Sequence, residues 1–285
     1  AITVAIILSI AYHQRFALGM SVFYCILAVF ADNYASEFPL FLTMLAGAVT
    51  CCFLLREIRT RMKLLEVSVV AAAVVFFFSF MLEFFDSADT LSGIILNSGY
   101  HAIFTFLVGL LIQGLLPVIE KIFKITTSMT LLDYSDANQP LLKRLAMEAP
   151  GTYSHSILIG SIAEAAAESI NRNGLLCRVG AYYHDIGKLN KPNYFIENEL
   201  GSDSRHKQLS PAMSQLIIVG HVKDGIEMAK EYKLPAILRQ FIETHHGTTL
   251  IEFFYNEAKK QQDEKKSPLS ENEFRYAGPK PRTKE

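Results

Sequence analysis

The sequence predicts an all-α protein in which a bundle of transmembrane helices precedes an all-helical soluble domain. Long apolar runs fill 1–123, whereas 124–285 has the mixed composition of a soluble protein. In this second part apolar residues recur at helical spacing, without a convincing strand-like alternation. The formal net charge of −1 gives no indication that a nucleic acid polymer is a partner.

Five apolar runs divide the first part of the chain. The last three reach the roughly 17 to 20 residues that a membrane-spanning helix needs, and the second is borderline. The first is too short to span, and it is not a secretory signal because it has neither Met nor a basic flank. We expect it to be the end of a helix whose start is missing, so that the printed chain is a fragment. The runs are Ala1–Tyr12, Phe16–Ala31, Pro39–Leu55, Leu64–Phe85 and Gly99–Phe123.

The charges between the runs predict the orientation in the membrane. The loop Arg56–Lys63 is strongly basic, whereas Asp32–Glu37 and Asp86–Asp89 carry acidic residues without Lys or Arg. Positively charged loops stay on the cytoplasmic side. We therefore expect Arg15, the basic loop and everything after Lys121 to be cytoplasmic, in a multi-pass protein of the cell membrane with the lipid bilayer as a partner.

The soluble part is predicted to begin with a linker over 124–140, followed by a helical domain over 141–285. Pro140 fits the first turn of a helix, and glycine and proline residues separate the helical patterns that follow. Asp224 or Gly225 is taken as the start of a new helix. The expected helices are Leu141–Ala149, Thr152–Ile170, Leu175–Ile186, Ser210–His221, Asp224–Lys233 and Pro235–His246.

Histidine residues and one aspartate predict a metal site in this domain. Imidazole suits Zn, Fe, Mn or Ni, and a carboxylate that bridges two ions suits a two-metal centre. Helical packing is able to bring together residues that are far apart in the sequence. The predicted ligands are His155, His184, Asp185, His221, His245 and His246.

These residues resemble the metal ligands of the HD-domain phosphohydrolases. The stretches Asn138–Tyr153, Tyr182–Lys188 and His245–Thr248 are similar, more closely, to the seven-transmembrane HD family. Members of that family hydrolyse cyclic di-AMP to the linear dinucleotide pApA. The resemblance therefore implies a membrane-anchored, metal-dependent phosphodiesterase of a cyclic dinucleotide, acting in the degradation of a second messenger.

The resemblance also implies how the ligands are shared. Asp185 would bridge two divalent transition metal ions, with Mn or Fe expected. One ion would be held by His155 and His184, and the other by His221, His245 and His246. A hydroxide between the ions would attack phosphorus in line with the leaving 3′ oxygen.

The resemblance further implies roles in catalysis and substrate binding. Asp185, His184 and Lys188 are the expected catalytic residues, and Lys188 is placed to reach a phosphate. Tyr153, His206 and Thr248 are further candidates for contacts with the substrate. A homodimer is left open.

The chain departs from the family pattern at three points. Family members have an extracellular domain and a first span that are absent here, and Ser154 stands where a second His is frequent. The family's last metal ligand is an Asp that follows a segment similar to Arg275–Pro281, and the chain ends at Glu285. We expect the printed chain to be inactive or weakly active and its longer parent to be an enzyme.

Two alternatives remain at this stage. An HD hydrolase of another nucleotide, such as cyclic di-GMP or an alarmone, would use the same ligands. However, the Gly-Tyr-Pro motif of the cyclic di-GMP relatives is absent, because Gly247-Thr248-Thr249 follows His246. The other alternative is a membrane sensor whose HD domain binds a nucleotide without hydrolysing it.

Overall fold

The computed structural model is helical and divides into two compact units, Ala1–Thr130 and Leu131–Glu285. In the part of the chain that it describes, no strand forms, and Leu250 and Arg275 make an isolated antiparallel bridge. The all-α prediction is therefore confirmed, whereas the domain boundaries at 123 and 140 stay predictions. The described residues are 1–12, 14–31, 37–55, 60–86, 90–123, 125–199, 204–261 and 269–285.

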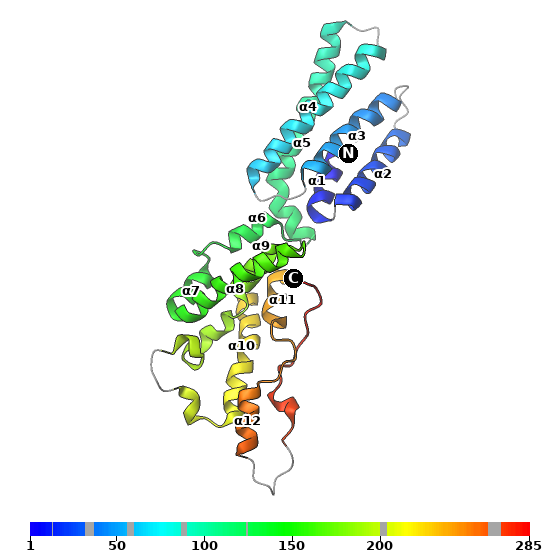
Figure 1. Cartoon of the computed structure of the whole chain (residues 1–285). Helices are drawn as coiled ribbons and strands as arrows, with labels where there is room; N and C mark the ends of the chain where they lie inside the picture. Colours follow the sequence, from blue (N-terminus) through cyan, green and yellow to red (C-terminus); the bar gives the residue numbers. More distant parts are fainter. Residues whose placement is uncertain are drawn as a thin grey trace. The chain divides into compact units, whose positions relative to one another are not determined.

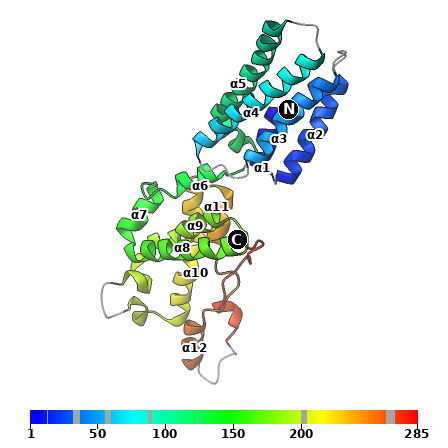
Figure 2. The ribbon, with the colours of Figure 1, turned by 45° about the horizontal axis from the view of Figure 1, so that its top comes forward.

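The first unit is a bundle of apolar helices (Figure 1). The helices α4 and α5 are its longest members and run side by side as a hairpin (Figure 2). The polar loops on which the predicted orientation depends, around 32–36, 56–59 and 87–89, fall outside the described residues. The bundle comprises α1 (Ile2–Ala11), α2 (Gln14–Ala31), α3 (Glu37–Leu54), α4 (Arg61–Asp86) and α5 (Leu91–Phe123).

Length and composition qualify three of the described helices to cross a membrane: Gln14–Ala31, Met62–Phe85 and Leu91–Phe123. The borderline second run thus forms a helix that is long enough, whereas Phe38–Leu54, in the third run, is a shorter apolar helix. The last helix begins well before Gly99 because Thr90 accepts a hydrogen bond from the Gly93 N–H (3.3 Å).

Small residues line the contacts inside this bundle, and large apolar residues cover its outside. Ala17, Ala48 and Ala71 are buried, whereas Phe85 and Phe104 are exposed. Small side chains let helices approach closely, and an apolar exterior suits a lipid environment. The first unit thus has the character of a membrane bundle.

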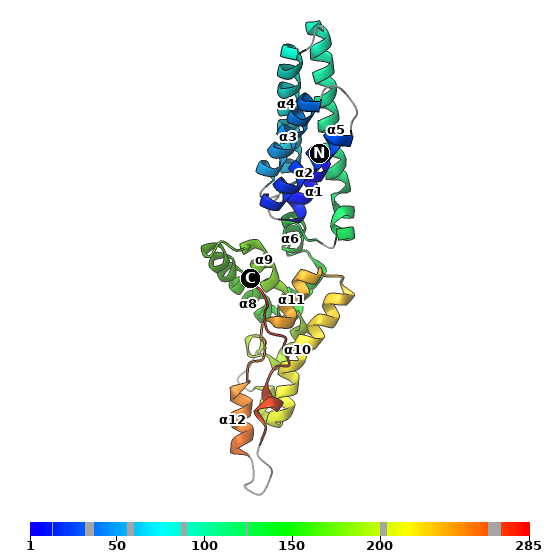
Figure 3. The same ribbon diagram turned by 90° about the vertical axis from the view of Figure 1, so that its right-hand side faces the viewer.

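The second unit contains the predicted ligands. The long helix α10 (Figure 3) and the helices α8 and α9, which lie side by side (Figure 1), form its framework. Among the described residues between α9 and α10, the chain forms four short 3₁₀ helices. The elements are α6 (Ser128–Tyr134, which crosses the boundary between the units), α7 (Pro140–Glu148), α8 (Pro150–Ser169), α9 (Gly174–Tyr183), η1 (Ile186–Asn190), η2 (Pro192–Tyr194), η3 (Ile196–Asn198), η4 (Arg205–Gln208), α10 (Pro211–Glu231), α11 (Ala236–Thr244), α12 (Glu252–Lys260) and η5 (Glu271–Phe274).

The predicted helix break between His221 and Asp224 is wrong. α10 is continuous from Pro211 to Glu231 and is capped by the Ser210 hydroxyl, which accepts from the Met213 N–H (3.3 Å). Gly225 does not stop the helix; it is buried where η1 packs against α10. A glycine that is needed for close packing thus has the same sequence pattern as a helix start.

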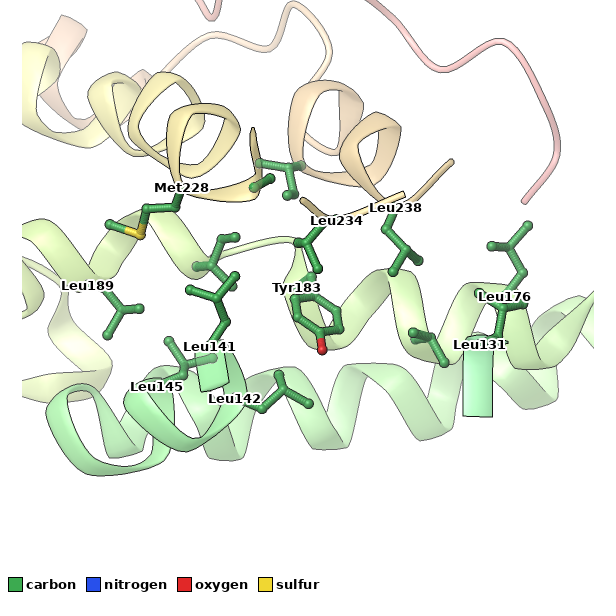
Figure 4. Close-up of a cluster of buried hydrophobic side chains, with 14 of the residues drawn as sticks. Leu131, Leu141, Leu142, Leu145, Leu176, Tyr183, Leu189, Met228, Leu234 and Leu238 are labelled. Carbon is green, nitrogen blue, oxygen red and sulfur yellow. The ribbon is translucent and has the colours of Figure 1, made fainter. Parts of the chain in front are cut away.

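The core of the second unit lies between α7, α9, α10 and α11 (Figure 4). Leu141, Leu142 and Leu145 extend from α7 toward apolar residues that include Leu238. Tyr183 at the end of α9 is fully buried, and its hydroxyl donates to the Tyr134 carbonyl (2.8 Å). This packing fixes the point where α9 ends, directly before His184 and Asp185.

Candidate metal centre

Asp185 lies at the junction of α9 and η1, in the interior of the second unit. Its side chain is 4% exposed, so its carboxylate is almost entirely removed from water. The apolar residues around this junction are buried, among them Val179, Tyr183 and Ile186. Burying a carboxylate costs several kcal/mol unless cationic or donor groups face it, so this position requires partners.

Two glycines bring η1 directly against α10. A Cβ on Gly187 would lie 1.8 Å from the His221 carbonyl oxygen and 2.5 Å from the Gly225 nitrogen. No side chain fits into that space. The close approach of the two backbones therefore depends on Gly187, and it places the carboxylate of Asp185 beside the imidazole of His221.

One group of candidate ligands surrounds Asp185 Oδ1. His221 Nε2 lies 3.2 Å and His245 Nε2 3.5 Å from this oxygen, and the two ring nitrogens are 3.3 Å apart. His246 joins them, since one ligand atom from each of the four residues lies within 4.8 Å of the others. α11 ends here, and the positive φ of Gly247 turns the chain away.

A second group lies around Asp185 Oδ2. His184 Nε2 is 3.1 Å from this oxygen, and His155, on α8, completes the group within the same 4.8 Å limit. The His155 and His184 rings are 5.7 Å apart, and His155 is exposed. Asp185 is common to both groups, an arrangement that suits a carboxylate bridging two cations.

The backbone orients these imidazoles. Nδ1 of His184 contacts the Ala181 carbonyl (2.6 Å), and Nδ1 of His245 lies 3.0 Å from the Ile242 carbonyl. Nδ1 of His221 likewise contacts the Ile218 carbonyl. Because a carbonyl accepts only from N–H, each Nδ1 carries the proton and each Nε2 presents a lone pair to the centre.

The resulting set of donors fits a divalent metal. Asp185 Oδ1 is buried and has no hydrogen-bond donor within the described part of the chain. The lone pairs of His221 Nε2 and His245 Nε2 would repel each other across 3.3 Å unless a cation lay between them. An orphaned carboxylate oxygen that faces imidazole lone pairs thus supports the divalent metal binding that the sequence predicts.

The pKa shifts in the metal-free protein also indicate that the surroundings of Asp185 stabilise positive charge. Burial opposes ionisation of Asp185, yet His184, His221 and His245 donate to its carboxylate whenever their Nε2 atoms are protonated in place of binding a metal, and this lowers the pKa of Asp185 well below the usual carboxyl range. Burial also opposes protonation of His184, but Asp185 raises its pKa. Burial and the adjacent His245 and His221 lower the pKa of His246 to about 3, so this imidazole is neutral at pH 7.

The other predicted site residues lie in different surroundings. Lys188 is next to the centre, with Nζ 2.8 Å from Asp185 Oδ2. Tyr153 packs against the core of the second unit, and the Thr248 carbonyl accepts from Arg275 (3.3 Å). His206 binds the Tyr194 carbonyl through Nε2 (2.8 Å). Their catalytic and substrate-binding roles stay predictions.

The structure adds residues that sequence reasoning missed. Tyr276 stacks on His246 at a ring distance of 4.0 Å and an interplanar angle of 13°. Glu197 binds the Lys188 ammonium at 2.7 Å and accepts from the Thr152 hydroxyl at 3.0 Å. Glu197 lies in the three-residue 3₁₀ helix η3 and Tyr276 lies outside any helix, so no periodicity marks either residue as inward-facing.

A pocket of about 330 Å³ adjoins the first group of ligands. His246 and Tyr276 form part of its wall, and α10 contributes both apolar and charged residues, including Lys223 and Lys230. The pocket provides space for part of a ligand beside His246.

Comparison with protein families assigns both parts of the chain. Residues 1–127 match the family described as "7TM receptor with intracellular HD hydrolase", and residues 152–275 match the HD domain. The HD match spans all six candidate ligands.

Individual relatives agree with this assignment. The chain is 48% identical over 180 residues to "Cyclic-di-AMP phosphodiesterase PgpH" of Bacillus subtilis, a match that covers 63% of the chain and 25% of the relative. It is 36% identical over 282 residues to the protein of the same name of Listeria monocytogenes, covering 98% and 38%. The chain thus spans between a quarter and two fifths of the length of these relatives.

A solved structure is also similar. It is the crystal structure of the L. monocytogenes phosphodiesterase PgpH HD domain in complex with cyclic di-AMP. Identity is 46%, the match covers 52% of this chain and 67% of that one, and the TM-score is 0.48.

Proposed function

Since the chain belongs to the family of 7TM receptors with an intracellular HD hydrolase, we propose that it forms the membrane anchor and catalytic unit of a cyclic di-AMP phosphodiesterase. The product would be linear pApA. The observation that carries this proposal is the convergence of five imidazoles from α8, α9, α10 and α11 on one buried carboxylate, Asp185. The names of the two PgpH relatives support the choice of substrate.

The candidate ligands would hold two divalent ions, Mn or Fe. His221, His245 and His246 would bind one ion, His155 and His184 would bind the other, and Asp185 would bind both. Bound ions would supply Lewis-acid activation of a water molecule and neutralise charge on the phosphoryl oxygens.

The protein's own groups would orient the reaction. Nδ1 hydrogen bonds to backbone carbonyls hold His184, His221 and His245 in the tautomer that binds a metal. Lys188, at the edge of the second group, would place its ammonium on a phosphoryl oxygen. The bundle would fix this unit at the cytoplasmic face of the membrane, where a cytoplasmic nucleotide is accessible.

The test is hydrolysis by the natural full-length protein, purified in detergent with Mn²⁺ or, without oxygen, with Fe²⁺. Cyclic di-AMP, cyclic di-GMP and an alarmone would be offered separately, and the products separated by chromatography. We expect pApA from cyclic di-AMP, and loss of turnover in Asp185→Ala and His184→Ala. Normal turnover by both variants would contradict the metal assignment. Tight binding of cyclic di-AMP without hydrolysis would indicate a sensor instead.

A further inference from the structure

We propose that Glu197 is a positioning residue for this hydrolysis, because its carboxylate holds the Lys188 ammonium at the edge of the metal centre. The inference rests on the proposed function. It assigns a task to a residue that lies outside the HD pair and its neighbouring histidines. Glu197 would act only through Lys188 and would touch neither substrate nor metal.

The ammonium of Lys188 has two carboxylate partners in fixed positions. Nζ lies 2.8 Å from Asp185 Oδ2 and 2.7 Å from Glu197 Oε1, and it also lies 4.9 Å from the centre of the Phe195 ring. The Lys188 side chain is 13% exposed. An ammonium has three N–H donors, so two are engaged by carboxylates and one remains for a further acceptor such as a phosphoryl oxygen.

Glu197 is itself fixed by the first turn of α8. The Thr152 hydroxyl donates to Glu197 Oε1 (3.0 Å), and Asn198 Nδ2 donates to the Thr152 hydroxyl (2.8 Å). Asn198 Oδ1 accepts from the Thr152 N–H (3.0 Å). This contact needs a glycine, because a Cβ on Gly151 would lie 1.7 Å from the Glu197 carbonyl oxygen. The carboxylate is therefore held independently of the centre.

Glu197 is needed as a counter-ion of Lys188 once metal ions are bound. When Asp185 binds two cations, its carboxylate offsets less of the charge on Lys188, which lies 2.8 Å away. Cations at the centre would then repel the ammonium. Glu197 remains as its counter-ion and keeps it within reach of the reacting phosphate. Without that carboxylate, the flexible lysine side chain would move toward water.

A double-mutant cycle in the full-length protein tests this task. We expect Glu197→Gln to lower kcat on the order of 10- to 100-fold and to leave the metal content unchanged, as is usual for partners of site residues. Lys188→Met would cost at least as much. In the Lys188→Met background, Glu197→Gln would have no further effect, because the residue through which it acts is gone. Glu199→Gln, the same charge change two residues along the chain, is the matched control.

A second readout does not depend on turnover. In the metal-free protein, acetylation of Lys188 by an amine reagent would be measured by mass spectrometry against the exposed Lys223. We expect Glu197→Gln to raise the relative modification of Lys188 several-fold, whereas Glu199→Gln would not.

The outcomes separate the two proposals. Three results would each overturn the role of Glu197. The losses of kcat from Lys188→Met and Glu197→Gln could multiply in the double variant, Glu197→Gln could lose metal, or Glu197→Gln could leave both kcat and the acetylation of Lys188 unchanged. If the wild-type protein holds metal but hydrolyses no cyclic dinucleotide, the proposed function is wrong, and the role in hydrolysis falls with it. The acetylation pattern would then show whether the contact between Glu197 and Lys188 exists.

Discussion

Replacing Gly187 by alanine is expected to separate Asp185 from His221. The new Cβ would have to retreat from 1.8 Å to at least 3.4 Å from the His221 carbonyl oxygen, a shift of about 1.6 Å. The contact between Asp185 Oδ1 and His221 Nε2 is 3.2 Å, so a displacement of that size takes the carboxylate out of range. Overpacking of this kind costs about 1 to 3 kcal/mol of folding free energy, and misplacing a reacting group by about 1 Å costs on the order of 100-fold in rate.

Metal content and thermal unfolding of the full-length protein measure this effect. We expect Gly187→Ala to lose metal at the site of His221, His245 and His246 and to unfold at a lower temperature. Gly220→Ala is the matched control, because this position on α10 has nothing within 4 Å of a new Cβ. That change should stabilise the helix by roughly 0.5 to 1 kcal/mol and leave the metal content intact. Wild-type metal content and stability in Gly187→Ala would refute the reasoning.

Three further predictions concern the ligands. Tyr276→Leu should weaken metal binding about 10- to 100-fold, because the stacked ring that orients His246 is lost, whereas Tyr276→Phe should keep the wild-type metal affinity. Titration with Mn²⁺ measures the affinity, and equal affinity in both variants would exclude the stack as the cause. Removal of metal with a chelator should lower the unfolding temperature, since ligand at about 100 times its Kd stabilises by about 2.7 kcal/mol; an unchanged temperature would argue against specific binding. In the unfolded chain His246 binds a proton near its ordinary pKa of about 6.5, whereas in the folded protein its pKa is about 3. Lowering the pH from 7 to 4 should therefore destabilise the metal-free protein more than its His246→Phe variant. Thermal unfolding across that pH range checks the sign, and a smaller loss in the wild type would contradict it.

Sequence reasoning reached the elements with a strong periodic signal. The apolar runs and the helices around the His-Asp pair follow from the spacing of apolar residues, and the structure brings all six predicted ligands into two groups around Asp185. This convergence has a physical basis. Imidazole and carboxylate side chains at the ends of packed helices have few ways to converge, and a metal is the partner that such donors share.

Other features depend on contacts between distant segments and leave little trace in the sequence. In the sequence Gly225 resembles a helix start, yet it lies within α10, where it allows η1 to pack closely against that helix. Glu197 lies nine residues after Lys188 along a path of short 3₁₀ turns, and Tyr276 reaches His246 from an extended segment. Only the folded chain shows that these residues pack against the candidate ligands or against residues next to them.

The most direct test of the central claim, that Asp185 is shared by two metal ions, is the metal stoichiometry of the full-length protein. Elemental analysis after purification with Mn²⁺ or Fe²⁺ should find about two ions per chain in the wild type. Asp185→Asn should lose both ions, whereas His245→Ala should lose the ion of its own group and retain the one near His184. Retention of two ions by Asp185→Asn would contradict the account.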